Sequence, residues 1–233
     1  MNRRRSKATP YRLHFDWVAD FARGQVRDLR VRWALEEVGQ PFAVRLLSQG
    51  AQKRPPHRAR QPFGQVPTLE DGDLILFESG AIVWHIAERF TGLMPGTAAA
   101  RAMQLEWAFA ALNTLEPPFM DHAMATLFEA DAPWSAPRLP AVMARIDERL
   151  HEASDRLGTA DWFGGEFGPG DLLMVSVLRM ADGMLDDHPN LAAYVARGTG
   201  RDAFGRALDD HMAGFTGAPP PVGPERAPPP DGP

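Results

Sequence analysis

Two short segments of the chain carry residues that could bind a small charged peptide. Val66-Pro67 precedes one apolar run, and Glu78-Ser79 stands where a second apolar run gives way to a helical pattern. An X-Pro bond can be cis, which turns the backbone sharply and leaves the amide and carbonyl of Val66 free for an incoming peptide. Ser79 and the first amides of a helix suit a carboxylate, whereas Glu78 suits an ammonium group. Each feature alone is an ordinary turn or cap, but together they favour a binding cradle.

The segment 50–62, shortly before Val66 in the sequence, contains several basic side chains. Its prolines predict a loop without regular structure. Lys53 is the first candidate in this segment for contact with a negatively charged ligand group, and Gln52 is the second candidate. Gln65, directly before Val66, completes the set of predicted ligand-binding residues.

The elements that must hold these residues follow from hydrophobic periodicity. Residues 11–15 and 42–47 read as strands around a helix over about 25–38, which predicts a parallel pair with a right-handed crossover. The runs 66–69 and 74–77 flank an Asp-Gly turn, so they predict an antiparallel hairpin. A helix over about 79–90 then closes a first domain, which we place at residues 11–92.

The remainder of the chain is helical in pattern and predicts a second domain at residues 97–212. Helices are expected over about 97–125, 139–157, 169–185, 191–196 and 201–210, with no strand. Pro117-Pro118 must end or kink the first of these helices. The segments 1–10 and 218–233 are expected to be disordered tails.

The segment 64–69 (Gly-Gln-Val-Pro-Thr-Leu), followed by 74–82 (Leu-Ile-Leu-Phe-Glu-Ser-Gly-Ala-Ile), resembles the glutathione-binding segment of the glutathione transferase family. The resemblance extends to the helical segment 29–37 and to the helix after Phe167, and it covers about residues 11–210. It identifies the chain as similar to bacterial-type members. The implied fold is an α/β thioredoxin-like N-terminal domain plus an all-α C-terminal helical domain.

The resemblance also implies a function and a set of contacts. Glutathione would be the substrate, with its cysteinyl part on the backbone of Val66, its γ-glutamyl group at Glu78 and Ser79, and its glycyl carboxylate at Lys53 or Gln52. Glutathione would be conjugated through its sulfur to an electrophilic, apolar small molecule, as in detoxification. A homodimer is the implied assembly.

The family's chemistry needs a hydroxyl or thiol donor where the first strand meets the first helix, because the thiolate is the nucleophile. Residues 15–28 contain no Ser, Thr, Tyr or Cys. Gln25, Arg27, Arg23 or the backbone amides at the helix start remain as candidates for stabilising the thiolate. Two alternatives therefore stay open: a glutathione-binding or protein-interaction module with little activity, and a glutathione-dependent peroxidase or isomerase.

The resemblance implies that the pocket for the second substrate lies beside the long helix that begins near residue 97. Its candidate residues are Trp17, Trp107, Asn113 and Phe119. Further along, the segment 167–172 resembles the family's buried helix start, which usually has Ser or Thr at the cap and Asp three residues on. Gly168 replaces that hydroxyl, so Asp171 keeps half of the capping box and is expected to be structural.

The amino-acid composition argues against several kinds of partner, metal site and cellular location. The formal net charge of −5 argues against a nucleic-acid partner. The absence of cysteine excludes disulfides, thiolate metal sites and cysteine-dependent thiol transfer. No two histidines have ligand spacing with a carboxylate, so no metal is expected. No apolar run is long enough for a membrane span or follows the basic start as a signal peptide, which predicts a cytoplasmic protein with no membrane partner.

Overall fold

The first domain is built on one mixed sheet of four strands in the order β2-β1-β3-β4. The computed structural model describes residues 11–181 and 183–220, except for the side chains of residues 11–13. The strands are β1 (Tyr11–Phe15), β2 (Ala43–Leu47), β3 (Thr68–Asp71) and β4 (Leu74–Phe77). β1 runs parallel to β2, while β3 is antiparallel to both β1 and β4. The parallel pair and the hairpin expected from the sequence are both confirmed.

The helices of this domain differ in part from the expectation. α1 (Asp28–Glu37) begins three residues later than predicted, because residues 20–26 form the short 3₁₀ helix η1 (Asp20–Ala22) and further turns. The prediction of a plain loop over 50–62 is wrong, since η2 (Ala51–Lys53) and α2 (Pro55–Arg58) form there. Prolines 55 and 56 occupy the first turn of α2, where no amide donor is needed. α3 (Ser79–Arg89) lies where it was expected.

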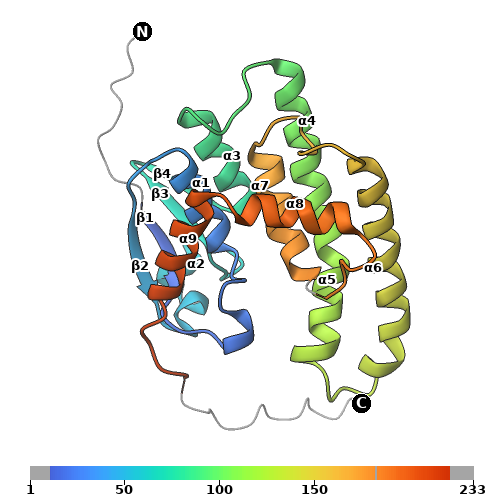
Figure 1. The fold of residues 1–233 in the computed structure, drawn as a ribbon. Helices are drawn as coiled ribbons and strands as arrows, with labels where there is room; N and C mark the ends of the chain where they lie inside the picture. The colour runs from blue at the N-terminus through green and yellow to red at the C-terminus, as the bar shows by residue number, and fades with distance from the viewer. Residues whose placement is uncertain (1–10, 182, 221–233) are drawn as a thin grey trace.

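The rest of the chain forms a helical domain beside the sheet (Figure 1). Within the described residues it contains no strand, as predicted. Its helices are α4 (Ala98–Phe109), α5 (Glu116–Ala123), α6 (Ser135–Leu157), α7 (Pro169–Leu178), α8 (Pro189–Thr199) and α9 (Asp202–Ala213), with the short 3₁₀ helix η5 (Arg179–Ala181) after α7. α7 is buried along its whole length and packs against α1, α3 and α4. The expected tails, 1–10 and most of 218–233, lie outside the described residues.

The long helix around Pro117-Pro118 stays continuous through a change of helix type. Two π-helical segments, η3 (Ala110–Leu115) and η4 (Met124–Phe128), flank α5. The two prolines stand in the first turn of α5 and supply no amide to the turn before them, and the wider π turn accommodates that loss. Where a kink was predicted, the helix changes to π-helical geometry before the prolines and continues to residue 128.

The start of α7 is capped by a side chain from another helix. Gln104 on α4 accepts from the Gly170 amide at 2.8 Å and donates to the Asp171 carboxylate at 3.1 Å. Asp171 also accepts from the Phe163 amide and from the Tyr194 hydroxyl, each at 2.9 Å. Burial raises the pKa of Asp171, although these donors act against it, and burial together with Asp171 raises the pKa of Tyr194 well above its ordinary value. Asp171 is therefore a hydrogen-bonded core residue, as the sequence suggested.

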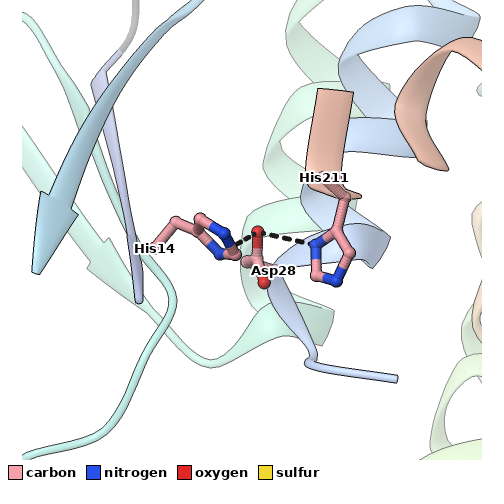
Figure 2. A group of neighbouring side chains, drawn as sticks. All are labelled: His14, Asp28 and His211. Carbon is pink, nitrogen blue, oxygen red and sulfur yellow. Dashed lines mark hydrogen bonds and ion pairs between the residues drawn. The ribbon is translucent and has the colours of Figure 1, made fainter. Parts of the chain in front are cut away.

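The last helix returns to the first domain, where α9 packs along α1 (Figure 1). A fully buried ion cluster joins them: the Asp28 carboxylate lies 3.0 Å from Nδ1 of His14 and 3.3 Å from Nδ1 of His211 (Figure 2). Arg32 Nε donates to the same Asp28 oxygen at 2.9 Å. The end of the region expected as a separate helical domain thus helps to complete the core of the first domain.

Sequence spacing did not reveal that two histidines and a carboxylate meet in this cluster. Arg32 already holds the Asp28 oxygen that a metal ion would need, and a guanidinium beside that position repels a cation. Burial lowers the pKa of His14 despite its contact with Asp28. Burial alone would raise the pKa of Asp28, but the two histidines hold it well below its ordinary value. The geometry is that of a buried ion-pair network.

Within the described residues, no helix combines the length and the apolar character needed to cross a bilayer.

Candidate functional site

A cleft of about 950 Å³ opens between the first domain and the helical segments η3, α5, η4 and η5. All seven residues predicted to bind the charged peptide line it: Gln52, Lys53, Gln65, Val66, Pro67, Glu78 and Ser79. Gln25 and Arg27 also line it, as do Asn113 and Phe119 from the helical domain. The fold thus brings residues separated by more than 60 positions into one cavity.

Three predicted site residues do not line the cleft. Arg23 pairs with Asp20 at 3.3 Å and lies over the ring of Phe215. Trp107 turns toward the helical core, where its ring centroid lies 4.3 Å from that of Phe163. Trp17, in the loop after β1, does not face the cavity, and its carbonyl accepts from the Gln49 side chain. The direction of these three side chains depends on tertiary packing, which the spacing of residues does not indicate.

The Val66-Pro67 bond is cis, which places the start of β3 at the wall of the cleft. The segment before it is held by side chains of the preceding turn: Gln61 accepts from the Gln65 amide at 3.1 Å, and His57 lies 2.7 Å from the Gln65 carbonyl. Gly64 has φ +63°, and a Cβ there would lie 2.8 Å from the carbonyl oxygen of Gln52. Glycine is therefore required for the η2 turn to approach this segment. His57 and Gln61 are supporting residues that the sequence did not reveal.

The second part of the cradle is the junction of β4 and α3. Glu78 has φ 68° and ψ 115°, a backbone conformation that a residue with a side chain rarely adopts. Such conformations persist where the surrounding structure imposes them, and they cluster at ligand sites. Ser79 begins α3 and is buried, with its hydroxyl accepting from Arg30 Nη1 at 3.3 Å. The positive end of the α3 dipole and the Arg30 guanidinium meet at this point of the cleft.

Arg30, which donates to Ser79, belongs to an ion-pair network that joins the two domains. Arg30 on α1 makes a two-point pair with Glu116 on α5, with N–O distances of 3.0 and 3.2 Å. Arg27 Nε donates to the same carboxylate at 2.8 Å. Burial lowers the pKa of Arg30 against the attraction of Glu116. Burial would raise the pKa of Glu116, but the two arginines hold it below its ordinary value.

This network leaves an excess positive charge at the cleft, because two guanidinium groups share one carboxylate. Arg30 and Glu116 are buried, whereas the Arg27 side chain stays 42% exposed. Arg27 is therefore the member of the network that can meet a ligand. Glu116 lies 86 positions from Arg30, and no pattern of spacing in the sequence connects them.

The part of the cleft that the helical domain lines is mostly apolar. Phe21 from η1 packs edge-on against Phe128 from η4, with ring centroids 5.5 Å apart, and so bridges the domains. The apolar side chains there include Leu112, Met120, Leu127, Met180 and Met184, and the polar groups are Asn113, His122, Thr126 and Arg179. This part of the cleft suits a small molecule with an apolar body.

Residues 21–88, which include the cis proline and the start of α3, match the family model for the glutathione S-transferase N-terminal domain. The chain is thus similar to glutathione S-transferases over this domain. Glutathione S-transferase 4 of Zea mays is 35% identical over 147 residues, which cover 59% of this chain and 65% of the maize protein. The chain thus spans just under two thirds of that relative's length. Glutathione S-transferase F11 of Arabidopsis thaliana is 34% identical, with 60% of its length covered.

Solved structures show the same glutathione S-transferase fold. A family member from Pseudomonas fluorescens, solved with two glutathione bound, superposes with a TM-score of 0.76 at 22% identity, covering 86% of this chain and 92% of that one. A theta-class enzyme from Xanthomonas axonopodis, with glutathione bound, gives 0.72 at 25% identity, covering 86% and 97%. The expected thioredoxin-like domain followed by an all-helical domain is confirmed. The bacterial-type qualifier is not supported, because the curated relatives above are plant proteins.

Proposed function

We propose that the protein binds glutathione in the cleft and conjugates it, through its sulfur, to an electrophilic, apolar small molecule. One observation carries the proposal: the cis turn at Pro67 and the start of α3 line the same cavity, which a helical domain with apolar side chains completes. The names of the maize and Arabidopsis relatives support transfer, and the bound glutathione in the Pseudomonas structure supports the ligand.

Each part of glutathione has a counterpart in this cavity. The backbone at Val66 takes the cysteinyl unit, and Glu78 receives the α-ammonium group of the γ-glutamyl unit. Ser79, with the first amides of α3 and the Arg30 charge behind it, receives the adjacent carboxylate. Lys53, with Gln52 beside it, receives the glycyl carboxylate at the open end of the cleft.

Arg27 is the group we assign to the thiolate. An ordinary thiol has a pKa of about 8.5, and a nearby cation lowers it. Arg27 lines the cleft and its guanidinium is held in place by Glu116, while Gln25 is exposed and Arg23 is paired outside the cavity. In the transfer the thiol proton leaves to solvent, the sulfur bonds to the electrophilic carbon, and the leaving group departs with the electron pair of the broken bond.

A second candidate function is glutathione binding without efficient transfer, as in an interaction module. The observation that favours it is the lack of any hydroxyl or thiol side chain over residues 15–28. Glutathione-dependent peroxidase or isomerase activity would use the same cavity and the same thiolate.

The test combines glutathione affinity with turnover of 1-chloro-2,4-dinitrobenzene. Glu78→Ala or Ser79→Ala should weaken glutathione binding by about 10- to 100-fold, since each removes a hydrogen bond to a charged group. Glu88→Ala, an exposed position on the same helix, is the matched control and should bind normally. Binding with turnover at the uncatalysed rate would favour the binding module, and unchanged affinity in both site variants would refute the site.

The proposal includes a homodimer and a cytoplasmic location. Exposed apolar side chains of the turn before β3, the edge strand β4 and α4 support self-association: Phe63, Leu74, Ile75, Met103 and Leu105. Sedimentation equilibrium should give twice the chain mass, and a monomer at micromolar concentration would contradict this part.

A further inference from the structure

Arg179 is a mostly buried cation that lines the cleft in η5, directly after α7. Its Nη1 donates to the Gly24 carbonyl at 3.1 Å, and its guanidinium carbon lies 4.9 Å from the ring centroid of Phe204. Among the described residues, Gly24 is its hydrogen-bond partner and no carboxylate pairs with it. An arginine has five N–H donors, so most of this one's donors are left for solvent or a ligand.

The two buried arginines of the described chain, unlike the partly buried Arg179, have carboxylate partners. Arg30 pairs with Glu116, and Arg32 pairs with Asp28. Burying a charge without a partner is costly, and here burial lowers the pKa of Arg179 with no carboxylate to oppose it. Within the described residues, interior charges are paired elsewhere, whereas Arg179 has no carboxylate partner and lies where a ligand would bind.

The charges of glutathione are already matched by other groups in the proposed function. Lys53 and Ser79 take its two carboxylates, and Arg27 takes the thiolate. Arg179 contacts the Gly24 carbonyl and lines the cleft together with Met180 and Met184, which provide apolar surface. An anionic partner for Arg179 would therefore have to come from the second molecule.

We propose that the second substrate of this cleft carries an anionic group, a carboxylate or similar oxyanion, which pairs with Arg179. The inference rests on the proposed transfer and adds the substrate class to it. The planar guanidinium matches a carboxylate through two parallel hydrogen bonds. Its contacts with Gly24 and Phe204 fix the guanidinium in one orientation, so little conformational freedom is lost on binding.

The experiment compares 4-chloro-3-nitrobenzoate with 4-chloro-3-nitrobenzamide, which have nearly the same shape and lose chloride in the same reaction. Each kcat/KM is divided by the uncatalysed rate constant, so that intrinsic reactivity cancels. The wild-type protein should favour the benzoate by about 10- to 100-fold, the range of a charged hydrogen bond. Arg179→Gln should remove the preference, and Arg179→Lys should restore part of it.

Arg197→Gln is the matched control. Arg197 also donates to a backbone carbonyl and lies over an aromatic ring, but it pairs with Asp161 and does not line the cleft. This variant should keep the preference for the benzoate. Equal losses for both compounds in Arg179→Gln would overturn the proposal, because they would show a purely structural role.

The thiolate is the other anion that Arg179 could serve, and a second measurement separates the two. If Arg179→Gln raises the pKa of bound glutathione while the benzoate preference stays, the proposal is overturned. If neither compound turns over, the proposed transfer fails. The affinity of the glutathione-loaded protein for the two compounds then decides the Arg179 proposal, which fails if the benzoate binds no tighter than the benzamide.

Discussion

Replacing Gln104 by alanine should destabilise the protein more than most single substitutions. The side chain is fully buried and makes hydrogen bonds to Gly170, Asp171 and the Glu166 carbonyl. The variant leaves the Gly170 amide and one Asp171 oxygen buried without these partners, at about 1–3 kcal/mol each. A loss of about 2–5 kcal/mol is therefore expected, which lowers Tm by roughly 5–15 °C in a chain of this size.

Gly168 gives a second perturbation that tests the reason for this loss. Its φ of −151° is open to any residue, so backbone freedom does not explain the glycine. A Cβ at this position would lie 2.4 Å from Cδ of Gln104. Gly168→Ser should therefore cost about 1–3 kcal/mol through overpacking while Gln104 is present.

The double variant is the decisive case. With Gln104→Ala the space beside residue 168 opens, and a serine there can accept from the first amides of α7 as an ordinary cap worth about 1 kcal/mol. The two changes should be less destabilising together than their sum by about 2 kcal/mol, as measured by urea unfolding of the four proteins. Additive effects within about 0.5 kcal/mol would refute the view that Gln104 replaces the missing cap hydroxyl.

Two further predictions concern charge. Arg27→Gln should raise the thiol pKa of bound glutathione by about one unit, read from thiolate absorbance against pH, and Arg27→Lys should keep it low; equal pKa values in all three proteins would exclude Arg27 from this role. His14 has a pKa below its ordinary 6.5 in the folded protein, so below that pH the unfolded chain takes up a proton that the folded one does not. The free energy of unfolding should fall as pH drops below 6.5, with a slope of at most about 1.4 kcal/mol per unit, and His14→Gln should show a shallower slope between pH 6.5 and 5.

The sheet could be predicted because its signals are local. Alternation over residues 11–15, an apolar run before Gly50 and the Asp71-Gly72 turn each depend on a few neighbouring residues. The start of α3 at Ser79 was similarly readable from the end of an apolar run. These features need no knowledge of the partner element.

The start of α1 could not be placed in this way. Asp28 begins the helix fully buried, and what makes that burial tolerable is the contact with His14, Arg32 and His211. His211 lies 183 positions away. The sequence showed a helical period beginning earlier, whereas tertiary packing decides that residues 20–26 form a 3₁₀ helix and turns.

The site illustrates the same limit. Its seven glutathione-contact candidates come from segments whose local turn chemistry is visible in sequence, and all seven line the cleft. Trp17 and Trp107 do not line the cleft, because residue type and position along the chain do not determine the direction of a side chain. Arg179 carried no local signal at all, since its isolation from carboxylates is a property of the packed structure.

The chain lacks a hydroxyl group of the family pattern at two places, and the same physical explanation applies to both. At residue 168 the hydroxyl of the cap is missing, and a side chain from α4 supplies the hydrogen bond in its place. At residues 15–28 the hydroxyl for the sulfur is missing, and in our proposal a guanidinium held by α5 supplies the positive charge. A search for a residue type at a fixed position finds neither replacement, because the lost group and its substitute belong to different elements. Both places require a polar or charged group at one position in space. Any element that reaches that position can supply the group.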